Sequence, residues 1–155
     1  MTAGEKYLEL VSRQVMENRI APFRACTNPR QDMAGPYVLN RKTVEDVVGD
    51  ARCGWYWLGR EFADKVPRVN YVGRSDTSMA TRLLQRRKFE YKFFWFHTTN
   101  TVREAFDGEC VDWHRLGGDE GWLDNDIHPD EPDDHKYPCP ISGCDERRGR
   151  VVNVR

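Results

Sequence analysis

Long hydrophobic runs are missing from this sequence of 155 residues. A helix that crosses a membrane needs about 20 consecutive apolar residues, and no stretch approaches that length. The first residues, MTAGEKYLEL, also lack the apolar segment of a secretory signal. We therefore expect a cytoplasmic protein.

An excess of charge of either sign is missing too, because 24 basic and 25 acidic residues leave a formal net charge of -1. This balance argues against a protein that coats nucleic acid by charge alone. The charges are nevertheless unevenly placed, since residues 124–134 are acidic and a basic cluster lies in the middle of the chain. That cluster consists of Arg82, Arg86, Arg87 and Lys88.

Cysteine is scarce, and its count of five is odd, which argues against a disulfide framework. In a cytosolic protein a close pair of cysteines more often marks a metal site. Internal repeats and low-complexity linkers are absent as well. With 39% hydrophobic and 32% charged residues, the chain has the composition of one compact globular domain with a small appendage.

Three runs rich in aromatic and β-branched residues predict strands. They are GWYWLG at residues 54–59, VNYVG at 69–73 and YKFFWFHT at 91–98. The run PYVLN at 36–40 suggests a short additional edge strand. We expect a small, mainly antiparallel sheet of three strands, which is enough for independent stability.

Apolar periodicity and capping signals predict the helices that flank this sheet. An amphipathic helix is expected at residues 5–20, a short one capped by Thr43 at 43–48, and a third at 76–88. Thr101 and Glu104 match a capping box at the start of a fourth helix, which glycines end at residues 117–118. The predicted class is α+β, with a helical extension at 1–35, a main domain at 36–125 and a loop-rich tail at 126–155.

Four residues follow one another in an informative order along these elements. They are Tyr56 in GWY, Tyr71 in YVG, Arg82 in the next helix and Glu109 in the helix after the third strand. Together with the YVGRS stretch and the step from Ala105 to Glu109, this order resembles the GIY-YIG nuclease family. The resemblance covers about residues 36–125, and it implies a metal-dependent endonuclease that hydrolyses DNA phosphodiester bonds.

The chemistry of phosphodiester cleavage suits these residue types. Tyrosine hydroxyls can orient a water molecule, and a forked guanidinium matches phosphate oxygens. A carboxylate is the hard ligand that Mg²⁺ or Mn²⁺ prefers. By the resemblance, Tyr56 is the better candidate for activating water beside Tyr71, Arg82 stabilises the phosphate, and Glu109 holds the cation. Asn125 is the candidate for an asparagine that family members tend to carry after the glutamate.

Contacts with DNA backbone phosphates are expected from basic and polar residues near this site. The turn residues Arg74 and Ser75 are candidates, as are Arg86, Arg87 and Lys88 at the end of the third helix. The alternative for the last three is a solvated helix end, where basic residues favourably oppose the helix dipole.

Each of the four site residues also has an ordinary alternative role. Strand tyrosines commonly belong to the core, and a helical arginine or glutamate is commonly a solvated surface residue. The rival function is therefore a nucleic-acid-binding module that keeps the fold without cutting. A third and weaker hypothesis is a protein-interaction domain built around the aromatic run YKFFWF.

A second group of residues predicts a zinc site that fastens the tail. Cys110 and His114 are four apart on one helix face, and Cys139 and Cys144 lie in the turn-like YPCPISGC. Two thiolates and a cysteine–histidine pair would form a closed tetrahedral site. His128 in HPDEP competes with His114 as nitrogen ligand. The alternative is that Cys110 is a small buried hydrophobe and His114 a surface residue.

Overall fold

The computed structural model of the chain describes residues 33–61, 67–125, 127–132 and 137–144. The helix expected at residues 5–20 lies outside these ranges, so the proposed boundaries of the N-terminal extension stay predictions. Within the described ranges, no helix combines the length and apolar character needed to cross a membrane.

The core of the structure is a four-stranded antiparallel sheet with the order β1-β4-β2-β3. Its strands are β1 (Ala34–Val38), β2 (Cys53–Glu61), β3 (Pro67–Ser75) and β4 (Phe93–Thr99). The predicted number of three strands is wrong, because β1 pairs with β4 and adds an edge to the sheet. Proline is tolerated at such an edge, since it removes no hydrogen bond between two inner strands.

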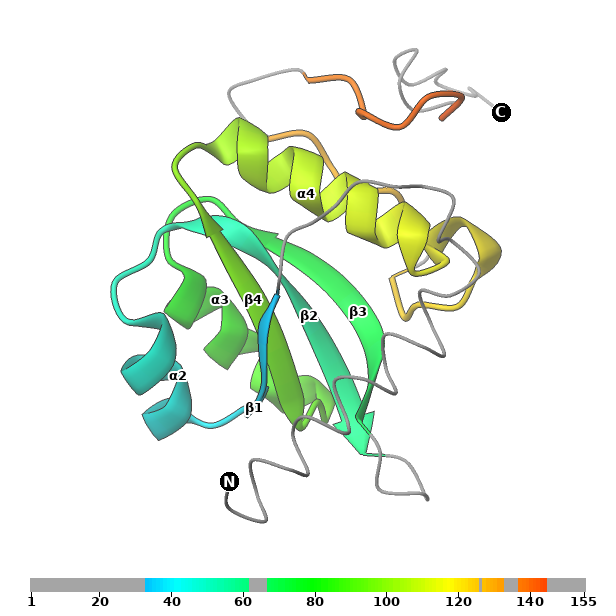
Figure 1. The fold of residues 1–155 in the computed structure, drawn as a ribbon. Coiled ribbons are helices and arrows are strands. Elements are labelled where there is room, and N and C mark those ends of the chain that lie inside the picture. Colours follow the sequence, from blue (N-terminus) through cyan, green and yellow to red (C-terminus); the bar gives the residue numbers. More distant parts are fainter. Residues whose placement is uncertain (1–32, 62–66, 126, 133–136, 145–155) are drawn as a thin grey trace.

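Helices cover both faces of the sheet, so the α+β class is confirmed (Figure 1). The short helices α2 (Arg41–Val48) and α3 (Met79–Arg86) lie on one face, and α4 (Val102–Arg115) lies on the other. Two short 3-10 helices, η3 (Arg87–Phe89) and η4 (Gly118–Glu120), follow α3 and α4. The edge strand β3 therefore has α3 on one side and α4 on the other.

The two sides of the sheet carry separate hydrophobic clusters, as the alternation of side chains along strands requires. The cluster under α2 and α3 includes Tyr56, Leu58, Phe94, Met79 and Leu83. The cluster under α4 is built largely on tryptophans, and its members include Trp57, Trp95 and Trp113. Successive residues of β2 thus face opposite helices.

The helix starts are fixed by side-chain caps. Asn40, and not Thr43 as expected, caps α2, since its side-chain oxygen accepts a hydrogen bond from the Thr43 amide at 2.8 Å. The predicted capping box of α4 is confirmed by the bond from the Glu104 amide to Thr101 Oγ1 at 3.1 Å. The Glu104 carboxylate reaches back to the amide of Asn100 at 3.2 Å.

Glycine at position 73 is a packing requirement of β2 and β3. Gly73 is paired with Tyr56 across the two strands, and a Cβ atom there would lie 2.5 Å from the Tyr56 hydroxyl oxygen. Glycine at position 108 has a similar role in α4, because a Cβ atom would lie 2.3 Å from the Trp55 ring. The glycine of YVG thus makes room for the tyrosine of GWY.

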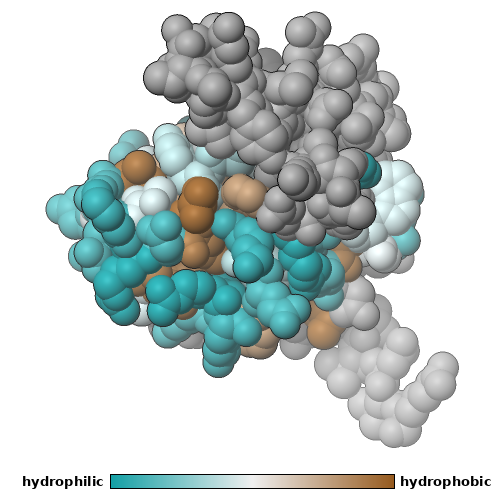
Figure 2. Space-filling model, turned by 90° about the horizontal axis from the view of Figure 1, so that it is seen from below, coloured by the Kyte–Doolittle hydropathy of each residue, from teal (hydrophilic) through white to brown (hydrophobic). Residues whose placement is uncertain are grey.

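The aromatic strand β4 lies inside the sheet, between β1 and β2. Its residues Phe94, Trp95 and Phe96 are at most 9% exposed, so the run YKFFWF offers little surface to a protein partner. Seen from below, hydrophilic side chains cover most of the described surface, with some hydrophobic ones between them (Figure 2). Isolated exposed hydrophobic residues are ordinary on folded proteins.

A buried carboxylate joins α4 to β2. Asp112 is 5% exposed, and its Oδ2 accepts hydrogen bonds from the indole nitrogens of Trp55 at 2.6 Å and Trp57 at 2.9 Å. The other oxygen, Oδ1, lies 3.5 Å from a guanidinium nitrogen of Arg115. This network holds the helix that carries Glu109 against the sheet.

We expect Asp112→Ala to lower the free energy of unfolding by about 2 to 4 kcal/mol, because it leaves two buried indole donors without an acceptor. The matched control is Asp46→Ala, whose carboxylate pairs with the exposed Lys42 at 2.7 Å. Such a surface pair contributes about 0 to 1 kcal/mol. Urea unfolding measures both variants, and equal losses would contradict a structural role for the Asp112 network.

Candidate active site and metal-binding group

The two motif tyrosines lie side by side on the face covered by α3. Their ring centroids are 6.4 Å apart with an interplanar angle of 19°. Tyr56 is fully buried, and its hydroxyl makes no well-formed hydrogen bond to any described residue. Tyr71, on the edge strand, is partly exposed. Burial is the main cause that raises the pKa of both hydroxyls above the usual value of 10.0.

This difference in exposure changes the expected division of roles between the tyrosines. Tyr56 was expected to be the better candidate for activating water, but its ring is enclosed by the core cluster beneath α3. Tyr71 is the partly exposed residue of the pair. The sequence alone could not show which tyrosine is more exposed, because both are tyrosines in predicted strands with similar neighbours.

Arginines of α3 supply positive charge beside these tyrosines. The guanidinium carbon of Arg86 lies 4.7 Å from the Tyr71 ring centroid, and Arg82 is exposed one turn earlier. Both guanidinium groups act to lower the pKa of Tyr71, against the effect of burial. Among the residues that the structure describes, the Arg82 side chain has no ion-pair partner. Arg87 and Lys88 are exposed in η3.

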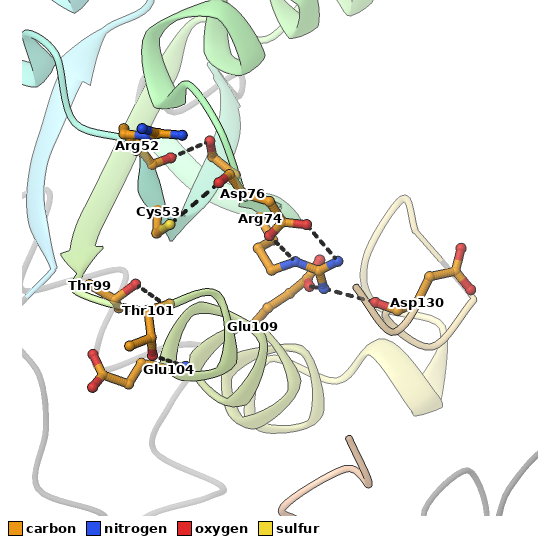
Figure 3. A network of polar contacts seen from close by, with 10 residues as sticks. Arg52, Cys53, Arg74, Asp76, Thr99, Thr101, Glu104, Glu109 and Asp130 are labelled. Carbon is orange, nitrogen blue, oxygen red and sulfur yellow. Dashed lines mark hydrogen bonds and ion pairs between the residues drawn. The ribbon is translucent and has the colours of Figure 1, made fainter. Parts of the chain in front are cut away.

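Glu109 is held by an arginine on the other face of β3. It is 8% exposed, and its Oε2 lies 2.6 Å from Nη1 of Arg74. The same guanidinium donates to Asp76 at 2.7 Å and to the backbone carbonyl of Asp130 at 2.8 Å. Figure 3 shows these three partners around Arg74, which come from the turn after β3, from α4 and from the tail.

The two turn residues that were expected to contact DNA phosphates both have partners within the protein. Arg74 is 12% exposed at its side chain and bonded to two carboxylates, so its guanidinium is already used within the protein. Ser75 is 2% exposed and its hydroxyl donates to the backbone oxygen of Arg52 at 2.7 Å. The two side chains point to opposite faces of β3, and each is bonded within the protein.

The four motif residues border the same edge strand without all touching one another. Tyr71 belongs to β3, Arg82 comes from α3 on one side, and Glu109 comes from α4 on the other. Glu109 lies near enough to raise the pKa of Tyr71 through its charge. Its direct partner is nevertheless Arg74, since no ion pair joins Glu109 to Arg82 within the described residues.

Burial raises the pKa of Glu109 from 4.5 to about 7, although Arg74 acts in the opposite direction. The folded protein therefore holds this proton more tightly than the unfolded chain does. The stabilisation is fully present below pH 4.5 and is lost as the pH rises through 7. The loss amounts to about 3 kcal/mol by linkage.

We expect Glu109→Gln to remove this part of the pH dependence in buffer without divalent cations. The variant should gain stability relative to the wild type between pH 5 and pH 8, by about 3 kcal/mol in all. Urea unfolding at pH 5 and pH 8 measures this difference in the free energy of unfolding. The control is Glu120→Gln, a substitution of an exposed residue. Parallel pH profiles for wild type and Glu109→Gln would contradict the prediction.

Asn125 closes the outer edge of β3. Its side-chain nitrogen donates to the Val72 carbonyl at 2.7 Å, and its oxygen accepts from the Val72 amide at 3.3 Å. The preceding Asp124 donates its amide to the Asn70 carbonyl at 2.6 Å. The amide group of Asn125, expected to act in catalysis, is thus bonded to the backbone next to Tyr71.

Two residues near the site were missed in the sequence. Tyr91 is buried, its ring centroid lies 5.9 Å from that of Tyr71, and its hydroxyl donates to Asp124 at 2.7 Å. Asp76 shares Arg74 with Glu109. The position of Asp76 directly after YVGRS was an available signal, whereas Tyr91 is one aromatic among several in its run.

A separate group of four side chains at the far end of α4 has the composition of a metal site. The possible ligand atoms of His114, His128, Cys139 and Cys144 all lie within 4.8 Å of one another. Cys139 Sγ is 3.6 Å from His114 Nε2. Tetrahedral zinc with ordinary bond lengths places a sulfur and a nitrogen ligand about 3.6 Å apart. The group is therefore compatible with zinc.

The predicted ligand set needs one correction, because Cys110 lies outside this group and both histidines lie in it. Cys110 is fully buried with Phe106 and Cys139. A hydrogen bond between the two thiols raises the pKa of Cys110 and is the main cause that lowers the pKa of Cys139. Cys110 is therefore a buried neighbour of the candidate ligand Cys139 and not a member of the ligand group.

Contacts around the histidines orient their rings. His114 Nδ1 lies 3.6 Å from the Asp119 carboxylate, while Nε2 faces Cys139. His128 Nδ1 lies 3.0 Å from the Pro129 carbonyl. Metal-binding histidines commonly direct their second nitrogen to a carboxylate or carbonyl in this way.

Comparisons of the chain with models of protein families, with curated proteins and with solved structures gave no match.

Proposed function

We propose that the protein is a metal-dependent endonuclease of the GIY-YIG type that hydrolyses DNA phosphodiester bonds. The observation that carries this proposal is the arrangement around the edge strand β3. Tyr71 lies on the strand, Arg82 is exposed on α3 beside it, and Glu109 on α4 is close enough to influence the Tyr71 hydroxyl. A hydroxyl, a forked cation and a carboxylate thus border one strand.

In the proposed reaction, each residue has a separate role. Tyr71 orients the attacking water through its hydroxyl, and Arg82 places its guanidinium against the phosphate as negative charge develops. Glu109 holds one Mg²⁺ or Mn²⁺ through the oxygen that Arg74 does not use. When bound, the cation supplies positive charge to the reacting phosphate. Tyr56 supports the Tyr71 ring from within the core.

We also propose that His114, His128, Cys139 and Cys144 bind one structural zinc ion. Two nitrogens and two sulfurs form a closed tetrahedral set, which suits a structural rather than a catalytic zinc. The site would fasten two separated parts of the tail, around His128 and Cys139, to the end of α4. The hydrophobic cluster of Phe106, Cys110 and Cys139 is small, so it buries too little apolar area to hold the tail on α4 without the zinc ion.

A non-cleaving nucleic-acid-binding module is the second candidate, and two observations favour it. Tyr56 is fully buried, and the Glu109 carboxylate is already paired with Arg74. A binding module would use Arg82, Arg86 and the η3 residues for phosphate contacts and would need no divalent cation.

DNA cleavage with and without divalent cations tests the proposal. Purified protein is incubated with supercoiled plasmid in Mg²⁺, in Mn²⁺ or in buffer without either cation and without chelator, and the nicked and linear products are measured on a gel. We expect products only with a divalent cation. A salt-sensitive gel shift that is the same with and without Mg²⁺ or Mn²⁺, and that gives no cleavage product, would favour the binding module and contradict the nuclease.

A further inference from the structure

The candidate zinc group and Glu109 are joined by two physical routes. The first is α4 itself, which carries both Glu109 and His114. The second runs through the tail, because Asp130 follows His128 by two residues and its carbonyl accepts a hydrogen bond from Arg74 at 2.8 Å. Arg74 in turn bonds Glu109 at 2.6 Å.

We propose that Arg74 is a positioning residue that couples the zinc group to the Glu109 carboxylate, by way of the Asp130 carbonyl. This inference rests on the proposed function, because it assigns zinc to the four-residue group and the cation to Glu109. Zinc then has a second effect besides holding the tail: it determines how firmly Glu109 is oriented.

The hydrogen bonds of Arg74 explain why a single side chain can connect the tail to Glu109. Its Nη1 is shared between Glu109 and Asp130, while Nε and Nη2 point to the carboxylate of Asp76. The planar guanidinium has a fixed fork, so it meets all three partners only in one orientation. Loss of the Asp130 contact leaves Nη1 with Glu109 as its one partner, so only the carboxylates of Asp76 and Glu109 then orient the guanidinium.

The chain between the two sites is too short to absorb such a change. Two residues span at most about 7 Å, so the position of the Asp130 carbonyl follows that of His128 closely. A bound zinc ion that fixes His128 therefore also fixes the third partner of Arg74. The link is reciprocal. If bound zinc favours the ordered position of Arg74 by some factor, then the ordered position of Arg74 favours zinc binding by the same factor.

This reciprocity gives a test that needs no cleavage activity. The dissociation constant for zinc is measured by competition with a chromogenic chelator for wild type, Arg74→Met, Arg74→Lys and Arg60→Met. Arg60 is the matched control, since it also pairs with a carboxylate, that of Asp124 at 2.5 Å, but outside the Arg74 network. All four proteins are used as full chains.

We expect Arg74→Met to raise the zinc dissociation constant by about 5- to 150-fold, which is the usual range of such coupling. Arg74→Lys should give a smaller rise, because an ammonium keeps the charge but loses the fork. Arg60→Met should match the wild type. Equal constants for Arg74→Met and wild type would overturn the proposal, as would an equal rise in Arg60→Met.

A second measurement keeps the proposal testable if the Met variant does not fold. In wild-type protein, the side-chain Nε–H of Arg74 is followed by NMR with zinc bound and after removal of zinc. We expect at least tenfold faster hydrogen exchange without zinc, and no change at Arg60. Unchanged exchange at Arg74 would also overturn the coupling.

The outcome for the proposed function is separate from these results. If the protein is no nuclease, plasmid stays intact in every variant while the zinc constants still differ. If the coupling is absent, the constants agree although wild-type protein cleaves DNA.

Discussion

Arg82→Ala and Glu109→Gln are each expected to lower the rate of DNA cleavage by at least about a hundredfold, equivalent to about 2.7 kcal/mol of lost transition-state stabilisation. Arg82 is exposed beside the tyrosine pair and has no ion-pair partner among the described residues, so its charge is available to a phosphate. Glutamine at 109 keeps the shape of the side chain and removes the charge that would hold the cation.

The two variants should differ in their response to metal. Glu109→Gln should regain part of its rate at raised Mn²⁺ or Mg²⁺ concentration, because a weakened metal site is filled by mass action. Arg82→Ala should not, since its lost charge acts directly on the phosphate. Initial rates are measured on supercoiled plasmid across a range of metal concentrations.

Arg41→Ala and Glu45→Gln are the matched controls for this experiment. These two exposed residues of α2 pair with each other at 3.3 Å and belong to no proposed site. Both controls should cleave DNA as the wild type does. A wild-type rate in Arg82→Ala or Glu109→Gln would contradict the roles assigned to these residues, and equal losses in the controls would point to a general effect of charge.

Removal of zinc should lower the melting temperature by about 10 °C or more. Structural zinc sites bind with apparent free energies of about 10 to 16 kcal/mol, and this energy is available only to the folded chain. If zinc binding adds only about 3 kcal/mol to the free energy of unfolding, its loss lowers the melting temperature by roughly 10 °C in a domain of this size. We expect one zinc ion per chain in the purified protein.

Single cysteine changes distinguish ligands from neighbours in this site. Cys139→Ser and Cys144→Ser should lose zinc and melt at the lower temperature, whereas Cys110→Ala should keep one zinc ion per chain, because Cys110 lies outside the four-residue group. Cys53→Ser is the control, since its thiol lies far along the chain and donates to the Asp76 carbonyl at 3.4 Å.

Metal analysis and thermal melting measure these outcomes together. Loss of zinc in Cys110→Ala with retention in Cys144→Ser would contradict the ligand set. Metal-free protein that melts like the wild type in every variant would contradict a structural zinc.

Features that depend on local patterns could be predicted from the amino-acid sequence. The aromatic runs predicted β2, β3 and β4, because a strand's richness in aromatic and β-branched residues is visible within a few residues. The capping box at Thr101 and Glu104 likewise fixed the start of α4, since its two hydrogen bonds join residues within one turn. The candidate ligands His114, Cys139 and Cys144 were also found from residue type and spacing.

Which of these residues face one another depends on the three-dimensional fold. Helical spacing places Cys110 and His114 on one side of α4, but the path of the tail brings His128, and not Cys110, into the group. The pair of Arg74 and Glu109 spans 35 residues, and it forms because β3 is the edge strand beneath α4. Local periodicity specifies an element and its buried face, whereas partners across the fold depend on strand order and chain path, which no short stretch contains.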